Sequence, residues 1–253
     1  LLAEARVTTR LSSDHIVQVL DAGIDATSST VFVVMELLSG STLEDLVQQR
    51  GPCSAEQTAE LLRQLAVGLD KAHGYVDASG NRAPIVHRDL KPGNLFLTQR
   101  DDGRPLLKIL DFGTAKVLSQ NTQASGMIRG TPQYMAYEQA SGDPITPGTD
   151  IWALGLIALY LLTGRSYWLT VERHGTQAQL FGEILTLPLV PASERLRELG
   201  TREWTDRRPT ARRQAFLPAR LHTSFDHRAV GPVNVRLPPC RSLEFANRPL
   251  PKR

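Results

Sequence analysis

The sequence predicts an α+β fold in which short strands come first and helices dominate the later part. Residues 31–35, 95–97 and 106–110 are apolar runs of the short length that strands usually have. An apolar stripe at 61–72 follows two helix-capping signals, and residues 151–162 form a longer apolar run. Because strand signals precede most of the helix signals, the pattern is typical of an α+β arrangement.

The first predicted elements are a helix and then two strands. Apolar residues recur at roughly helical spacing over 2–11, and the apolar run 16–20 then ends at Asp21. Residues 31–35 are apolar and rich in β-branched side chains, and they end before Gly40. Such a short, continuous apolar run predicts a buried strand.

Two helices follow, each announced by a capping box, in which a Ser oxygen accepts an N–H three residues on and an acid or amide reaches back. Ser41 with Glu44 predicts the first start, and Ser54 with Gln57 predicts the second. The second helix carries a single apolar stripe that we expect in the core: Leu61, Leu62, Leu65, Ala66, Leu69 and Ala72.

A hairpin and a helical region complete the predicted fold. The apolar runs 95–97 and 106–110 are joined by the turn-rich stretch 100–105, which predicts a β-hairpin. Residues 151–162 are apolar on every side, as in a helix buried all round. Apolar residues at helical spacing are available for packing further on: Leu180, Ile184, Leu185, Leu196 and Leu199.

The charge of the chain is unevenly distributed and marks a boundary near Gly200. Eleven Arg and one Lys against four acids give residues 201–253 a charge of +8, which leaves −5 for residues 1–200 within the net +3. The tail also holds seven of the sixteen prolines and no lasting apolar pattern. We therefore expect two parts, and the Arg/Pro-rich tail is either disordered or the product of a shifted reading frame.

Several functional classes are disfavoured by composition. Cys53 and Cys240 are far apart, which excludes a disulfide scaffold and a Cys-rich zinc site and indicates a reducing, cytoplasmic location. The longest apolar run, 151–162, is too short to cross a bilayer. The basic tail lacks the close interleaving of basic and aromatic residues that is typical of nucleic-acid-binding surfaces, so we expect no nucleic-acid partner. We also expect no membrane segment in this chain.

Four motifs in a fixed order carry the chemistry. HRDLKPGN spans 87–94, DFG spans 111–113 directly after the predicted strand 106–110, GTPQYMAYE spans 130–138 and DIWALG spans 150–155. Together they resemble the eukaryotic-type protein kinase family in its bacterial Ser/Thr branch. The resemblance covers residues 1–200, from the family's αC helix through αF and beyond, and implies a bilobal fold with a partial N-lobe and a mostly helical C-lobe.

The resemblance implies a Ser/Thr protein kinase that uses ATP and Mg²⁺ to phosphorylate protein hydroxyl groups. Asp89 would be the catalytic base, and Lys91 would balance charge on the γ-phosphate and indicates Ser/Thr substrates. Asn94 and Asp111 would hold Mg²⁺ through amide and carboxylate oxygens. Arg88 would receive a phosphate on the activation segment, whose candidate acceptors are Ser119, Thr122 and Ser125.

The same resemblance places an adenine pocket. Glu36 and Leu38 would lie at the hinge that contacts adenine, and Phe96 would form the floor of the pocket. His87 and Phe112 would stack on each other in the hydrophobic spine.

Other residues would have supporting roles. Glu4 matches the αC glutamate that pairs with a strand lysine, and Thr131 would contact Asp89 or Lys91. Asp150 would brace the catalytic-loop backbone. Glu138 would pair with an arginine, for which Arg208 is a candidate.

The sequence also departs from the family pattern. It contains no Gly-rich loop and no lysine-bearing strand before the αC match, and Tyr137 stands where the family usually has proline. We therefore expect an N-terminally incomplete domain with impaired activity, or alternatively a catalytically inactive, pseudokinase-like interaction fragment. For Asp89, Asn94 and Asp111 the alternative is an ordinary role in turns or caps.

Overall fold

The computed structural model describes residues 11–25, 27, 30–112 and 132–200. These ranges leave out almost all of the predicted helix at 2–11. They also leave out the candidate phosphorylation sites and the tail at 201–253. Glu4, Thr131 and Arg208 lie outside them as well, so their predicted roles stay predictions.

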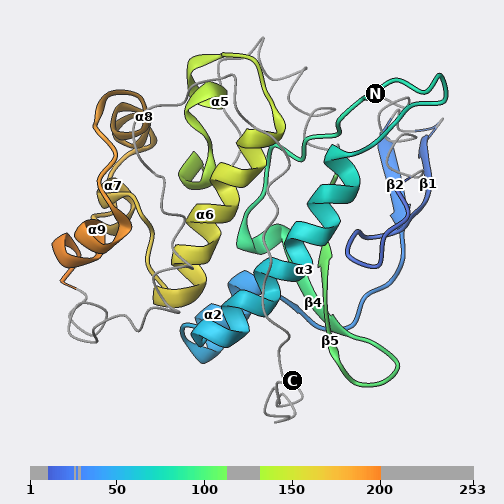
Figure 1. The fold of residues 1–253 in the computed structure, drawn as a ribbon, viewed down its shortest axis with the longest axis horizontal. Helices are drawn as coiled ribbons and strands as arrows, with labels where there is room; N and C mark the ends of the chain where they lie inside the picture. The colour runs from blue at the N-terminus through green and yellow to red at the C-terminus, as the bar shows by residue number, and fades with distance from the viewer. Residues whose placement is uncertain (1–10, 26, 28–29, 113–131, 201–253) are drawn as a thin grey trace.

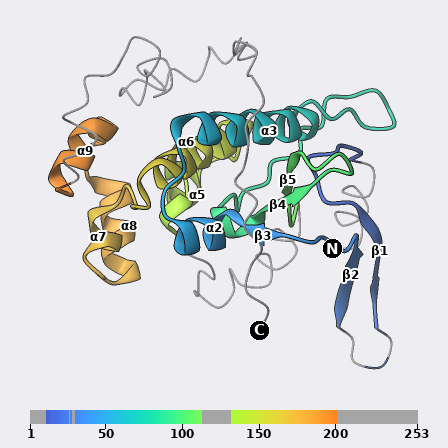
Figure 2. The ribbon, with the colours of Figure 1, turned by 90° about the horizontal axis from the view of Figure 1, so that it is seen from below.

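The described elements run from strands to helices. They are β1 (Val19–Ile24), β2 (Val31–Met35), β3 (Ser41–Thr42), α2 (Leu43–Arg50), α3 (Ala55–His73), β4 (Leu95–Gln99), β5 (Pro105–Ile109), α5 (Tyr137–Ser141), α6 (Pro147–Thr163), α7 (Leu169–Glu172), α8 (Gln177–Thr186) and α9 (Ala192–Glu198). Short 3-10 helices span Pro92–Asn94 and Pro132–Tyr134. The β1–β2 hairpin lies at one end of the molecule and α7 to α9 lie at the other, with α3 beside α6 between them (Figures 1 and 2). The predicted α+β arrangement is confirmed.

The β1–β2 hairpin differs from the prediction in its burial. The two strands pair antiparallel, with Gly23 opposite Phe32, but the side chains of Phe32, Val34 and Met35 are 42%, 44% and 37% exposed. Within the described residues this sheet consists of β1 and β2. The prediction of a buried strand at 31–35 is wrong in this respect, because two strands alone leave part of both faces uncovered.

The second sheet has the order β3-β4-β5 and confirms the predicted hairpin. Leu97 lies opposite Leu107 in β4 and β5, and Ser41 of β3 lies opposite Leu97 on the other side. Gly40, at φ 152°, precedes β3 and approaches the Leu97 carbonyl so closely that a Cβ there would overlap it. This glycine is required for the chain to enter the sheet.

The helix starts are confirmed in one case and shifted by one residue in the other. At α3, Ser54 Oγ accepts the Gln57 N–H at 3.2 Å and Gln57 Oε1 accepts the Ser54 N–H at 3.0 Å. At α2 the cap is Thr42 with Asp45, not the predicted Ser41 with Glu44. Both pairs have the required spacing, but Thr42 pairs in β3 together with Ser41 and is extended, so the helix starts one residue later.

The Thr42 cap contributes to the stability of α2. Replacing Thr42 with Ala removes the hydroxyl that accepts the Asp45 N–H, so we expect a loss of about 1 kcal/mol of unfolding free energy. Replacing Ser41 with Ala is the matched control and should change stability much less. Urea unfolding followed by circular dichroism measures both, and a larger effect at Ser41 would contradict the observed cap.

The main core lies between α3, α6 and the β4–β5 hairpin. Its fully buried members come from all of these elements: Leu61, Leu65, Leu69, Leu95, Leu107, Ile109, Ile157 and Leu161. The predicted stripe of α3 is confirmed as core at Leu61, Leu65, Leu69 and Ala72, whereas Leu62 and Ala66 are half-buried. The prediction that the helix at 151–162 is buried all round is wrong, because Ile151 is 50% exposed and several other residues of α6 are only half-buried. Gly68 lets α3 approach β5, since a Cβ there would be 2.7 Å from Ile109 Cδ1.

A second core lies under α7, α8 and α9. It is built around Trp168, which is 1% exposed, with Leu180, Ile184 and Leu196. Leu185, which we also expected to be available for packing, is 37% exposed instead. Within the described part of the chain, no helix is both long and apolar enough to cross a membrane.

Candidate active site

The predicted catalytic residues lie in the loop that connects α3 to β4, and their side chains meet. Lys91 Nζ donates to Asp89 Oδ2 at 2.8 Å. Asn94 Nδ2 donates to the Asp89 carbonyl at 2.8 Å and to Asp89 Oδ2 at 3.1 Å. The Asp89 carboxylate is therefore held by a cation and an amide from its own loop, while its side chain stays 39% exposed and open to a reactant.

Asp150, near the start of α6, supports the backbone of the catalytic-motif loop 87–94. Its side chain is 1% exposed and accepts the His87 N–H and the Arg88 N–H, each at 2.9 Å. The third partner is His73 Nε2, at 2.7 Å. Buried N–H groups need acceptors, so one carboxylate at the start of α6 satisfies two backbone donors of the catalytic loop.

His73 is a supporting residue that sequence reasoning missed. It occupies the last position of α3, where a basic side chain is usual for helix-end electrostatics alone. Only the approach of α3 to α6 brings it to Asp150, 77 residues further along the chain.

Asp111 is placed beside the catalytic loop by its two neighbours. The Leu110 N–H donates to the Asn94 carbonyl at 2.9 Å, and His87 Nε2 donates to the Leu110 carbonyl at 2.7 Å. The rings of His87 and Phe112 are in contact, with centroids 4.8 Å apart, but they meet edge to face and not as a parallel stack. Asp111 itself has a left-handed φ of 55°, which is uncommon outside glycine.

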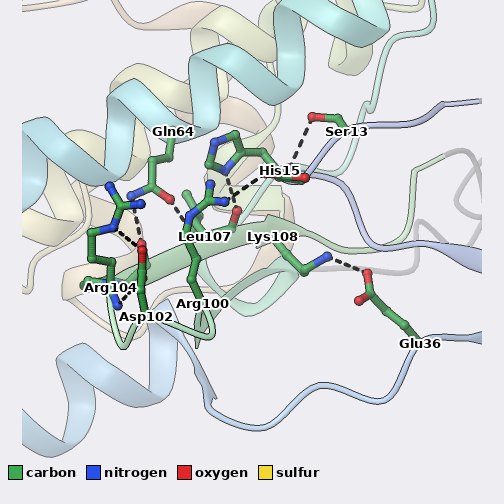
Figure 3. A network of polar contacts seen from close by, with 11 residues as sticks. Ser13, His15, Glu36, Gln64, Arg100, Asp102, Arg104, Leu107 and Lys108 are labelled. Atoms are coloured by element: carbon green, nitrogen blue, oxygen red, sulfur yellow. Dashed lines mark hydrogen bonds and ion pairs between the residues drawn. The ribbon is translucent and has the colours of Figure 1, made fainter.

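The predicted hinge residues lie on the segment between β2 and β3. Glu36 makes an ion pair with Lys108 of β5 at 2.6 Å (Figure 3). Its carboxylate also accepts the Gln18 N–H at 2.8 Å. The Glu36 N–H donates to the Gln18 carbonyl at 3.0 Å. Leu38 is half-buried on the same segment. Phe96, also half-buried, lies opposite Lys108 in the β4–β5 pairing.

A polar network anchors β5 to α3 and to the segment before β1 (Figure 3). The Leu107 N–H donates to Gln64 Oε1 of α3 at 2.8 Å, and the Leu107 carbonyl lies 2.9 Å from His15 Nδ1. Both side chains are buried. Sequence reasoning did not single them out, although a Gln within an apolar helical stripe is a usable signal that a buried backbone group needs a partner.

The segment after residue 131 packs against the helical part. Glu138 Oε1 accepts the Thr149 hydroxyl at 2.6 Å, and Tyr137 is 51% exposed. Trp168 Nε1 donates to the Gln133 carbonyl at 2.8 Å, so the buried indole supports this segment.

The Glu44 carboxylate lies against the loop 87–94, and two phenols, those of Tyr134 and Tyr160, lie within electrostatic reach of it. A Cβ at Gly93 would lie 2.9 Å from Glu44 Oε2, which places this carboxylate against the loop. Burial raises the pKa of Tyr134 well above its ordinary value, and the charges of Tyr160 and Glu44 raise it further. Burial likewise raises the pKa of Tyr160, with a smaller contribution from Glu44. Both phenols therefore stay neutral at physiological pH.

The predicted magnesium ligands, Asn94 and Asp111, fit Mg²⁺ only if a bound ligand supplies further oxygen atoms. Among the described residues, no group of three or more His, Cys, Asp or Glu is placed to hold a metal ion. Asn94 uses its amide nitrogen within the loop, which orients its oxygen away from Asp89. One amide oxygen from Asn94, with a carboxylate from Asp111, whose backbone lies beside the loop, would suit a magnesium site completed by phosphates and water.

Comparisons with known proteins agree with this arrangement. The family model for the protein kinase domain matches residues 1–220. Serine/threonine-protein kinase Pkn1 of Myxococcus xanthus is 39% identical over 193 residues, which cover 76% of this chain and 26% of Pkn1. Serine/threonine-protein kinase PknA of Mycobacterium tuberculosis is 34% identical over 167 residues, covering 64% of this chain and 36% of PknA. The matches thus span about a quarter to a third of these relatives.

Solved structures give the same result. The crystal structure of Rad53 in complex with AMP-PNP matches with a TM-score of 0.53 and 28% identity, covering 71% of this chain and 41% of that chain. A mutant of the PknI kinase domain of Mycobacterium tuberculosis matches with a TM-score of 0.50 and 26% identity, covering 66% of this chain and 57% of that chain.

Proposed function

The chain belongs to the protein kinase family, and on that premise we propose that it transfers the γ-phosphoryl group of ATP to Ser and Thr hydroxyl groups of proteins. The observation that carries the proposal is the catalytic loop, where Lys91 and Asn94 both donate to the Asp89 carboxylate. The relatives with similar sequences are named serine/threonine-protein kinases. Lys91 in this position supports the same hydroxyl class.

In the proposed reaction, the substrate hydroxyl oxygen bonds to the γ-phosphorus while the bond from that phosphorus to the β–γ bridging oxygen breaks. Asp89 orients the hydroxyl and accepts its proton. Lys91, 2.8 Å from Asp89, balances charge on the oxygens of the transferred group. Mg²⁺, held by Asn94 and Asp111, would neutralise phosphate charge when bound.

ATP is proposed as the nucleotide because the matching Rad53 structure contains AMP-PNP, an ATP analogue. The adenine would lie between the hinge residues Glu36 and Leu38 and the ring of Phe96. Lys108 supports this proposed hinge by holding the Glu36 side chain. We also propose that the kinase domain of this chain ends near Gly200.

An inactive interaction module is the second candidate. The 253 residues contain no Gly-rich loop to cover the phosphates, and Tyr137 replaces the usual proline. We therefore propose that transfer by these residues alone is weak, because backbone amides that would stabilise the γ-phosphate are not supplied. Binding of the nucleotide distinguishes the two candidates.

Thermal unfolding with Mg·ATP tests nucleotide binding. At a ligand concentration about 100 times Kd, binding stabilises the folded chain by about 2.7 kcal/mol, which raises Tm by roughly 5–10 °C for a domain of this size. Asp111→Asn should remove most of that rise because it removes a metal-binding charge.

Asp102→Asn is the matched control for this experiment. Asp102 lies in the exposed β4–β5 turn, where it pairs with Arg104. This variant should keep the full rise in Tm. No rise in the unchanged chain would favour the inactive module.

A further inference from the structure

We propose that Gln139 positions the catalytic base, because its side-chain amide holds the peptide group between Arg88 and Asp89. This inference rests on the proposed role of Asp89. Gln139 lies in α5, immediately after Glu138, and is half-buried. It touches no reactant in the proposed reaction and acts through the catalytic-loop backbone.

The contact joins two segments that are far apart in sequence. Gln139 Nε2 donates to the Arg88 carbonyl at 2.7 Å, and Gln139 Oε1 accepts the Ala136 N–H at 3.0 Å. The two ends of one amide therefore link the backbone before α5 to the backbone of the catalytic loop, 51 residues earlier.

The peptide group that Gln139 holds leads directly into Asp89. The Arg88 carbonyl and the Asp89 N–H belong to the same planar unit, so fixing the oxygen also fixes the direction of the N–H. That N–H donates to His87 Nδ1 at 3.3 Å. Hydrogen bonds thus fix both the Arg88 carbonyl and the Asp89 N–H of this peptide group, and they thereby fix the position of the Asp89 Cα.

Arg88 needs this support because its backbone is strained. Its φ of 70° is left-handed, a conformation that costs a non-glycine residue about 1–2 kcal/mol. Such a conformation persists only where the surroundings fix it. Asp150 holds the Arg88 N–H at 2.9 Å on one side, and Gln139 holds the Arg88 carbonyl on the other.

Comparison with two other helices separates this role from ordinary capping. Gln57 in α3 and Gln179 in α8 occupy the same N3 position, and each pairs with the hydroxyl-bearing cap residue of its own helix. The cap residue of α5 is Ala136, which has no hydroxyl, and α5 has only five residues. Gln139 extends its donor group to another segment, which Gln57 and Gln179 do not do in any contact among the described residues.

The test uses Gln139→Glu with Gln57→Glu as the matched control. Glu can still accept the cap N–H, so both variants keep the helix start. At position 139, however, the change removes the donor to the Arg88 carbonyl and turns a carboxylate toward that oxygen. We expect kcat for peptide phosphorylation by the 253-residue chain to fall about ten- to a hundredfold in Gln139→Glu. KM for ATP should change little, and Gln57→Glu should match the unchanged chain.

Hydrogen exchange provides a readout that does not depend on activity. The amides of residues 87–94 should lose protection in Gln139→Glu and keep it in Gln57→Glu. If the unchanged chain transfers no phosphate and shows no rise in Tm with Mg·ATP, the proposed function fails, and the exchange result alone decides the role of Gln139. Gln139→Leu, which removes both hydrogen bonds without adding charge, carries the same expectations if Gln139→Glu does not fold. Normal protection together with unchanged kcat would overturn the inference.

Discussion

Replacing Asp89 with Asn is expected to lower the rate of phosphoryl transfer to a protein substrate by about 10²–10⁴-fold. Asn has nearly the same shape but cannot accept the hydroxyl proton. Lys91 and Asn94 would also lose the charged oxygen to which both now donate. Transfer of labelled γ-phosphate to a generic protein substrate measures the effect.

The control for this experiment is Asp102→Asn, which makes the same chemical change in an exposed turn. It should leave the transfer rate unchanged. Equal rates for Asp89→Asn and the unchanged chain would exclude Asp89 as the base. The loop would then be explained by its turn-forming hydrogen bonds alone.

Replacing Asp150 with Asn is expected to destabilise the fold by about 3–5 kcal/mol, the usual effect of breaking a buried charged contact. The carboxylate accepts from His87, Arg88 and His73 while almost wholly buried. An amide offers one acceptor oxygen in place of two and places a donor against a donor. A donor that has lost its acceptor oxygen on residue 150 is then buried, where no water replaces the lost hydrogen bond.

Thermal unfolding measures this effect, and a fall in Tm of about 6–20 °C corresponds to the expected loss at this domain size. Asp143→Asn is the control, because Asp143 is exposed and accepts only the Ser141 hydroxyl among the described residues. Its Tm should stay close to that of the unchanged chain. A similar Tm for Asp150→Asn would show that Asp150 does not brace the loop.

The local elements were largely predictable, and the errors have identifiable causes. The α3 start at Ser54 followed from one capping box without a competitor. At α2, two overlapping boxes were present, and the strand pairing of Thr42, which keeps this residue extended, decided between them. The apolar content of β2 predicted a strand correctly, but burial depends on what covers the strand, which its own sequence does not contain.

The candidate site was predictable where its residues are close in sequence. Asp89, Lys91 and Asn94 lie within six residues, so one loop conformation brings them together. The supporting residues are different. His73 and Gln139 act on this loop from α3 and α5, and neither has a motif that names its partner.

The sequence by itself determined the order of strands and helices, the boundary in charge near Gly200 and the family's catalytic motifs, because periodicity, composition and short spacings are local properties. Only the tertiary structure decided how the catalytic loop is held. The Arg88 peptide groups require partners, and the side chains that satisfy them, Asp150 and Gln139, are brought there by the packing of separate helices.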